Sequence, residues 1–208
     1  FQMSTYQPST PPLTAPAGDM ERMARVHAKQ RVRAIELRES TVAQRIEKIK
    51  KLRDLVLARR QDIYDAMWAD FHKPEAEVDL SEILVVVQEA NDAIKNLKRW
   101  MKPQRVPATW PLMGTQNQIR YEPRGVCLII APWNFPVNLM LGPLIACIAA
   151  GNTAMMKPSE MTPATSLLMQ QFLEALFDEG DVAVFQGGAD TTQALLALKF
   201  DHCFFTGS

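Results

Sequence analysis

The sequence predicts an α/β fold in which a Rossmann-like parallel sheet, flanked by helices, follows an amino-terminal helical region. Three observations lead to this prediction. From residue 125 onward, short apolar runs alternate with helical segments. Residues 19–102 are rich in charge and repeat their apolar side chains at helical spacing. Residues 103–124 hold several prolines and one alternating stretch, which is typical of a loop that leads into an exposed strand.

The first 18 residues are expected to lie outside the fold. Phe1 and Gln2 precede the first methionine and look like the remnant of an engineered tag. From Ser4 to Gly18 the chain is mainly Pro, Ser, Thr and Ala, with too little apolar material to order itself. We therefore predict a flexible, Pro-rich arm.

Residues 19–102 predict a series of helices. The first repeats apolar side chains at every third position from Met20, and Ser40 is the expected N-cap of the second. Residues 72–74, His-Lys-Pro, should end a third helix, and a fourth should run over about 75–100. One apolar face of the second helix is formed by Ile46, Ile49, Leu52 and Val56. The Lys and Arg residues on the opposite face indicate a solvated surface.

Residues 125–208 predict four parallel strands joined by three helices. The strands are expected at 126–131, 153–156, 182–185 and 202–205, and the helices at 137–150, 165–177 and 191–198. Continuous apolar strands indicate a sheet covered on both faces, with right-handed crossovers. Ligands of such sheets bind at the carboxyl ends of the strands.

Composition and cysteine usage argue against several classes of partner. The 23 basic and 23 acidic residues cancel, so we expect no nucleic acid and no anionic membrane partner. The longest apolar stretch, 137–150, is too short to span a bilayer. Cys127, Cys147 and Cys203 lie in apolar runs, which indicates buried, reduced thiols and a cytoplasmic protein. The histidines lack metal-ligand spacing, so we expect no metal site.

Two polar side chains follow one of the predicted strands. Lys157 can donate to ribose hydroxyls and Glu160 can accept from them, which makes the pair a candidate ribose site. A carboxylate near a helix start is also favoured by the helix dipole, so an ordinary salt bridge explains the pair as well. Taken alone, the pair indicates the salt bridge first.

Two other strand ends carry candidate residues. Asn134 lies in a turn bordered by prolines, so its amide could be held toward an oxyanion or could serve turn geometry only. Residues 206–208, Thr-Gly-Ser, could open a pyrophosphate-binding helix or form a plain turn. The usual GxGxxG fingerprint of dinucleotide sites is missing from the sequence.

Taken together, four motifs resemble the aldehyde dehydrogenase superfamily in order and spacing. They are Pro-Trp-Asn-Phe-Pro at 132–136, Ala-Gly-Asn-Thr at 150–153, Lys-Pro-Ser-Glu at 157–160 and Phe-Thr-Gly-Ser at 205–208. The resemblance extends over about 19–208. The stretches 177–188 and 200–202 resemble the class 3 branch of the superfamily, and coniferyl aldehyde dehydrogenase most of all.

The resemblance implies NAD(P)-dependent oxidation of a small aldehyde to its carboxylic acid. In this chemistry a cysteine forms a thiohemiacetal, a hydride passes to the cofactor, and a thioester is hydrolysed. We expect NAD to be preferred over NADP, because Glu160 would repel a 2′-phosphate on the ribose. A homodimer is expected as well.

The same resemblance assigns roles to individual residues. Asn134 would donate to the oxyanion, and Phe135 would line the aldehyde pocket. Residues 130–133 would border the nicotinamide, Lys157 and Glu160 would hold the adenosine ribose, and Gly187 would pass the adenine side. The full cofactor-binding set is Ile130, Ala131, Pro132, Trp133, Lys157, Ser159, Glu160, Gly187, Phe205, Thr206, Gly207 and Ser208.

The chain departs from the family in what it lacks. The nucleophilic cysteine and the general-base glutamate of the family would lie beyond Ser208, so we expect an incomplete aldehyde dehydrogenase fold that is inactive by itself. Residues 116–121 resemble the family's oligomerisation hairpin. Two other functions remain open, namely a non-catalytic nucleotide-binding or interaction module, and an acyl-CoA or acyl-phosphate reductase on the same scaffold.

Overall fold

The computed structural model describes residues 17–207. The expected tag remnant, most of the expected arm and Ser208 lie outside this range. Helix α1 (Ala17–Leu37) begins at Ala17, so the helical region starts slightly before the predicted boundary at residue 19. None of the helices in the described range is long and apolar enough to cross a membrane.

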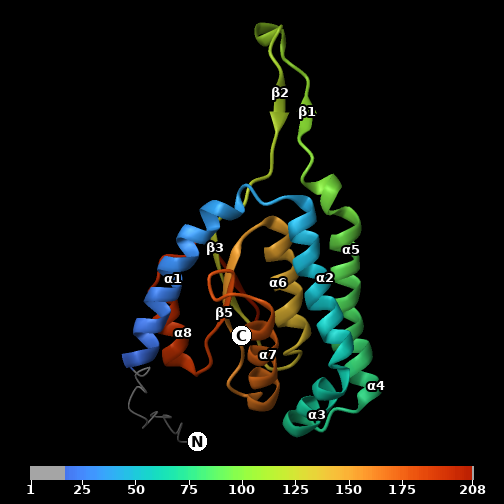
Figure 1. Ribbon diagram of the computed structural model, residues 1–208, viewed down its shortest axis with the longest axis vertical. Helices are drawn as coiled ribbons and strands as arrows, with labels where there is room; N and C mark the ends of the chain where they lie inside the picture. The colour runs from blue at the N-terminus through green and yellow to red at the C-terminus, as the bar shows by residue number, and fades with distance from the viewer. Residues whose placement is uncertain (1–16, 208) are drawn as a thin grey trace, which may run out of the picture.

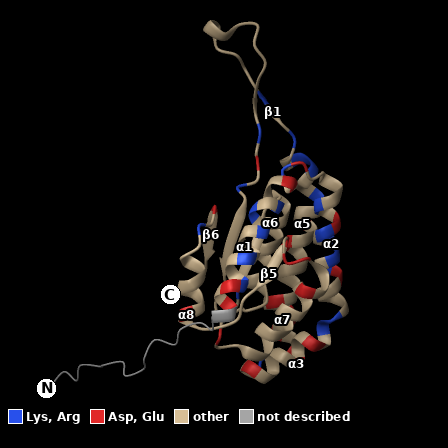
Figure 2. Ribbon diagram, turned by 60° about the vertical axis from the view of Figure 1, so that its left-hand side comes forward, with Lys and Arg blue, Asp and Glu red and all other residues tan. Residues whose placement is uncertain are grey.

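The remaining amino-terminal helices form a layer beside the sheet (Figure 1). They are α2 (Val42–Ala58), α3 (Arg60–Phe71), α4 (Glu75–Val78), the π-helical turn η1 (Asp79–Ile83) and α5 (Leu84–Trp100). Because α4, η1 and α5 follow one another without a break, they confirm the predicted helix over 75–100. The third helix ends as predicted, with His72 in the left-handed region at φ 53°. Basic and acidic residues both occur along the helical layer (Figure 2).

The predicted N-cap of α2 is wrong by one residue. Thr41, and not Ser40, caps the helix, because its Oγ1 accepts a hydrogen bond from the Gln44 backbone N–H and the Gln44 side chain accepts from the Thr41 N–H. Ser40 Oγ instead accepts from Arg45 Nε at 2.8 Å. Its hydroxyl therefore serves a buried arginine and not the helix start.

A two-stranded hairpin projects from the body of the molecule (Figure 1). Strand β1 (Gln104–Val106) pairs antiparallel with β2 (Asn117–Ile119), and the short 3-10 helix η2 (Trp110–Leu112) lies at the tip. The sequence predicted β2 within the stretch 116–121 but not its partner β1. Prolines on both sides leave β1 only three residues, too few to show an alternating pattern.

The rest of the chain forms the predicted parallel sheet. Its elements are β3 (Val126–Ile130), α6 (Asn138–Ala150), β4 (Thr153–Lys157), α7 (Pro163–Leu176), β5 (Val182–Val184), α8 (Ala189–Leu196) and β6 (His202–Phe205). The strand order is β5-β4-β3-β6, and every neighbouring pair is parallel. The alternation of strands and helices is therefore confirmed.

The two faces of the sheet carry separate apolar cores. Leu128 and Ile130 of β3 pack with residues of α1 and α8 on one face. Cys127 and Ile129, the alternate residues, pack on the other face with the larger cluster built from α2, α3, α5, α6 and α7. Helix α1 thus covers the sheet directly, while α2 and α5 reach it through α6.

The predicted burial of Cys203 is wrong. Cys127 and Cys147 are buried, but Cys203 is exposed on β6, all of whose residues are exposed. Strand β6 is one of the two edge strands of the described sheet and lies next to β3 only. An apolar strand sequence therefore did not show that the strand would be buried.

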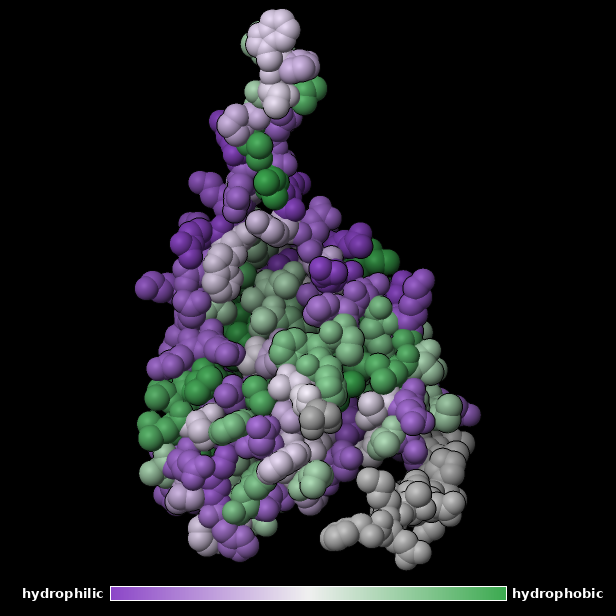
Figure 3. Space-filling model, turned by 180° about the vertical axis from the view of Figure 1, so that it is seen from behind, coloured by the Kyte–Doolittle hydropathy of each residue, from purple (hydrophilic) through white to green (hydrophobic). Residues whose placement is uncertain are grey.

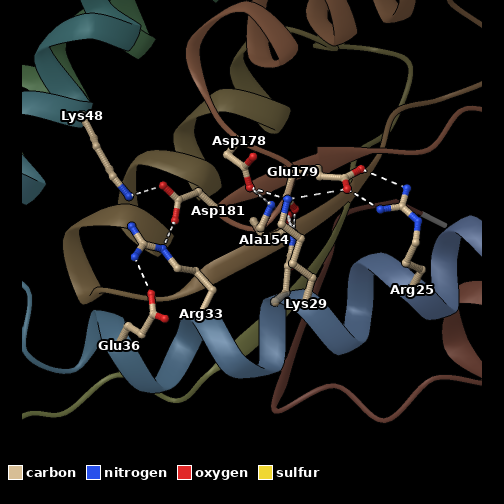
Figure 4. A network of polar contacts seen from close by, with 11 residues as sticks. Arg25, Lys29, Arg33, Glu36, Lys48, Ala154, Asp178, Glu179 and Asp181 are labelled. Carbon is tan, nitrogen blue, oxygen red and sulfur yellow. Dashed lines mark hydrogen bonds and ion pairs between the residues drawn. The ribbon is translucent and has the colours of Figure 1, made fainter.

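Ion pairs fasten α1 to the amino end of β5 (Figure 4). Asp181, which directly precedes β5, accepts from Arg33 Nε at 2.8 Å and from Lys48 Nζ at 2.5 Å. Glu179 pairs with Arg25 and Lys29 of α1. These contacts lie at the end of the sheet opposite to the carboxyl ends of the strands.

Candidate functional site

A cleft of about 620 Å³ lies at the carboxyl ends of β3, β4 and β6. It is lined by Ile130, Ala131, Pro132, Trp133, Asn134, Lys157, Ser159, Glu160, Met161, Thr192, Phe205, Thr206 and Gly207. The position agrees with the rule that open parallel sheets bind ligands at this edge.

Strand register explains why distant segments meet in the cleft. Ile130 of β3 lies level with Lys157 of β4 on one side and with Phe205 of β6 on the other. The backbone continues this pairing beyond the strands, because Ala131 N donates to Lys157 O at 3.0 Å and Thr206 N donates to Ile130 O at 3.2 Å. The three loops therefore leave the sheet side by side.

The structure brings most of the predicted site residues together, but not all of them. Gly187 and Phe135 do not line the cleft, and Ser208 lies outside the described residues. Two lining residues, Met161 and Thr192, were not predicted from the sequence. Thr192 lies in the first part of α8, and its Oγ1 donates to Gly188 O at 3.2 Å. The glycine pair 187–188 predicts a helix start close to the cleft, and this signal could have identified Thr192.

Lys157 and Glu160 form the ion pair that the sequence allowed. Lys157 Nζ lies 2.6 Å from Glu160 Oε2, with the lysine side chain 5% exposed and the glutamate side chain 51% exposed. Partial burial acts to raise the pKa of Glu160, but the hydrogen bond from Lys157, a backbone hydrogen bond and the positive charge of Lys157 together outweigh it and hold this pKa below its ordinary value. The carboxylate is therefore ionised at neutral pH, and its half-exposed side chain lines the cleft.

Asn134 is exposed in the loop between β3 and α6, and within residues 17–207 its amide forms no hydrogen bond. Its neighbours are more constrained. The Trp133 ring stacks on Phe71 of α3 at 6.2 Å between centroids, and Lys73 Nζ lies 4.7 Å from the centre of the Phe135 ring. The amide is thus free to donate to a ligand, while the residue on either side of it contacts a residue of the helical region.

Gly207 shapes the wall that follows β6. Its φ is +148°, a value that favours glycine, and a Cβ there would lie 3.3 Å from Phe205 Cζ. A side chain would therefore crowd the turn and strain its backbone. The absence of one leaves the peptide accessible from the cleft.

Among the described residues, the cleft is lined by no cysteine and by no metal-binding group. Its lining includes none of the three cysteines. Burial raises the pKa of Cys203, and hydrogen bonding to Cys127 together with burial raises that of Cys147, which disfavours the nucleophilic thiolate form at both positions. Residues 17–207 hold no group of three or more His, Cys, Asp or Glu side chains placed to bind a metal ion.

Known proteins match this chain along nearly its whole length. The model of the aldehyde dehydrogenase family matches residues 3–208. A putative aldehyde dehydrogenase, AldX, of Bacillus subtilis is 40% identical over 191 residues, which cover 91% of this chain and 42% of that protein. A probable coniferyl aldehyde dehydrogenase of Caulobacter vibrioides is 40% identical over 186 residues, or 86% of this chain and 38% of that protein.

A solved structure has the same fold. Staphylococcus aureus AldH in a substrate-bound state superimposes with a TM-score of 0.87 at 35% sequence identity, covering 89% of this chain and 41% of that one. The chain therefore spans less than half of the length of the relatives it matches. Both the incomplete fold and the resemblance to coniferyl aldehyde dehydrogenases are confirmed, and the chain belongs to the aldehyde dehydrogenase family.

Proposed function

We propose that this chain is the amino-terminal part of an enzyme that oxidises a small aldehyde to its carboxylic acid with NAD. The observation that carries the proposal is the single cleft shared by the Asn134 loop, the Lys157–Glu160 pair and the Gly207 turn. Membership of the aldehyde dehydrogenase family supports the reaction class. The aldehyde itself is left open.

The residues of the cleft fit a dinucleotide. Its volume of about 620 Å³ lies within the roughly 300–1,000 Å³ that is typical of small-molecule sites. Glu160 would accept from ribose hydroxyls and Lys157 would donate to them, while the accessible peptide at Gly207 would face the pyrophosphate. Residues 130–133 would border the nicotinamide. When bound, the cofactor supplies the hydride acceptor of the reaction.

Asn134 would act on the aldehyde oxygen. As a nucleophile adds to the carbonyl carbon, negative charge develops on the oxygen, and the Asn134 amide N–H would donate to it. Because the cleft contains no cysteine, we place the nucleophile in a part of the protein outside this chain. The chain alone would then bind the cofactor and orient the aldehyde, but it would not catalyse the oxidation.

The test is Asn134→Ala in the complete protein. We expect kcat to fall about 100-fold, which is the usual effect of losing one oxyanion donor, with the NAD dissociation constant nearly unchanged. Absorbance of the reduced cofactor measures the rate, and calorimetric titration measures the affinity. Asn96→Ala, which removes an exposed amide on α5, is the matched control. A wild-type kcat in Asn134→Ala would refute the assigned role.

Product analysis separates the two chemistries available to this scaffold. We expect the free carboxylic acid to be formed whether or not coenzyme A is present. Formation of an acyl-CoA would overturn the hydrolytic assignment in favour of an acylating enzyme.

The finer assignments belong to the same proposal. We propose a preference for NAD over NADP, a reducing, cytoplasmic compartment, and a homodimer assembled through the β1–β2 hairpin. The support for the dimer is the exposure of apolar side chains on the hairpin, where Trp110 is 84% exposed and Met113 is 71% exposed.

A further inference from the structure

The loop that carries Asn134 is held by a carboxylate from a distant helix. Glu82, in η1, is fully buried, and its Oε2 accepts a hydrogen bond from the Asn138 backbone N–H at 2.8 Å. Asn138 Nδ2 in turn donates to Ser81 O at 3.3 Å. Two contacts therefore fasten the first residue of α6, immediately after the Asn134 loop, to η1.

The other Glu82 oxygen connects to the same loop by a second route. Lys73 Nζ lies 3.3 Å from Glu82 Oε1, and the lysine side chain is only 10% exposed. The Lys73 ammonium also lies 4.7 Å from the centre of the Phe135 ring and 5.7 Å from that of Phe71. Phe71 stacks on Trp133. Phe135 thus lies beside Lys73, and Trp133 stacks on a ring that Lys73 also faces.

Local structure explains why Glu82 can reach α6. Helix α6 has no side-chain cap of its own, because its N-cap residue is Val137. A carboxylate there satisfies a free backbone N–H and suits the positive end of the helix dipole. The π-helical turn η1 adds a residue to the helix at this point, and such turns are frequent at functional sites.

Stability alone is a weak reason for this arrangement. A buried ion pair must overcome the desolvation of both charges, and well-packed apolar side chains are often as stable in its place. What the pair provides is a fixed geometry, because Lys73 and Glu82 connect α3, η1 and the start of α6 at three points around the Asn134 loop.

We propose that Lys73 and Glu82 are positioning residues that hold the 132–138 loop so that the Asn134 amide is directed at the aldehyde oxygen. The proposal rests on the role assigned to Asn134 under the proposed function. It adds two residues from the helical region, neither of which lines the cleft, to the determinants of turnover.

The experiment compares Glu82→Gln, Lys73→Met and Asn134→Ala, singly and combined, in the complete protein. Glutamine keeps an acceptor for the Asn138 N–H but loses the charge that holds Lys73, and methionine keeps the apolar stem over Phe135. Glu82→Gln and Lys73→Met should each lower kcat by about 10-fold, with an NAD dissociation constant within about twofold of wild type. Hydrogen exchange in residues 132–138 should accelerate in both variants.

The double variant separates positioning from general damage. If Glu82 acts through Asn134, then Glu82→Gln should lower kcat no further in the Asn134→Ala background. An equal further loss there would overturn the proposal and leave the role of Asn134 intact. A wild-type kcat in Asn134→Ala would refute the proposed function instead. Lys73→Met gives the same two outcomes if Glu82→Gln does not fold.

Asp181→Asn is the matched control for stability. It also removes the charge of a mostly buried carboxylate that binds two cations, but at the opposite end of the sheet. We expect it to lower Tm while kcat stays at the wild-type value. If it lowers kcat as much as Glu82→Gln does, the effect is one of stability and the positioning role is wrong.

Discussion

A single carboxylate has two roles in the proposed cofactor site. Glu160 is held by Lys157 through one oxygen, and its half-exposed side chain lines the cleft. Its pKa lies below the ordinary value, so the group is charged throughout the neutral range. A fixed negative charge at the edge of a cleft attracts hydroxyl donors and repels phosphates.

Replacement of Glu160 by glutamine should relax the choice of cofactor. The amide can still bind a ribose hydroxyl but no longer repels a 2′-phosphate, so the ratio of kcat/KM for NAD to that for NADP should fall about 10-fold. Steady-state kinetics with each cofactor in the complete protein measure the ratio.

Glu174→Gln, which removes an exposed charge on α7 outside the cleft, should leave that ratio unchanged. An unaltered ratio in Glu160→Gln would contradict its assignment to the ribose.

Single residues mark the limit of what the sequence could predict. Side chains that follow directly after strands were predicted to meet, and most of them do, because parallel strands end at one edge. Met161 and Thr192 were missed because their positions depend on how the following helices turn over the sheet. The sequence predicted Ser40 as the N-cap of α2, but the Ser40 hydroxyl binds the buried Arg45, and Thr41 caps the helix instead.

Among the elements, α1 is held in place by ion pairs as well as by its apolar face. Arg25, Lys29 and Arg33 all face acidic residues just before β5 (Figure 4). Of these acids, Asp181 has a side chain only 14% exposed. Burial acts to raise the pKa of Asp181, but the hydrogen bonds from Arg33 and Lys48 and the positive charges of these two residues together outweigh it and hold this pKa below its ordinary value.

Asp181→Asn should therefore destabilise the fold in a pH-dependent way. A lowered carboxyl pKa stabilises the folded state above the unfolded value, and this stabilisation is lost as pH falls through the folded pKa. At pH 7 the free energy of unfolding should decrease by about 2 kcal/mol. Urea denaturation at pH 7 and again near pH 3 measures the difference.

The difference in free energy of unfolding between the wild type and Asp181→Asn should be smaller near pH 3, where Asp181 itself becomes protonated. A gap that is constant or wider there would show that the charge of Asp181 does not fasten α1. Glu47→Gln is the control. Glu47 pairs with Lys51 on the exposed face of α2, so its replacement should change the free energy of unfolding very little.

Long elements were easier to predict than short ones or interrupted ones. The helix over 75–100 was recognised from its extent, but nothing in its periodicity revealed that η1 turns Glu82 toward α6. Strand β1 was missed because three residues carry no pattern. Strand β6 was predicted correctly, but the exposure of Cys203 depends on what lies beside the strand and not on the strand itself.

At the scale of the molecule, residues 17–207 leave apolar surface uncovered on the body and on the hairpin. Figure 3 shows apolar side chains gathered over the middle of the face opposite to that of Figure 1, and others at the stem of the hairpin. Phe204 and Phe205 of β6 are exposed by 40% and 60%. Exposed apolar surface and open strand edges favour association.

The hairpin gives a direct test of the proposed dimer. Ile119, at the end of β2, is 47% exposed, and a lysine there would put a charge on a strand that is expected to join a second copy. In the complete protein, Ile119→Lys should raise the dimer dissociation constant at least about 10-fold, as measured by light scattering after size exclusion over a dilution series.

Val32→Lys makes the same change at an exposed apolar residue of α1, away from the hairpin, and should leave the dimer intact. Because Ile119 does not line the cleft, Ile119→Lys should also keep its affinity for NAD. If both lysine variants dissociate alike, general surface charge governs the assembly. If neither dissociates, the copies meet through another surface, and the hairpin has no part in the dimer.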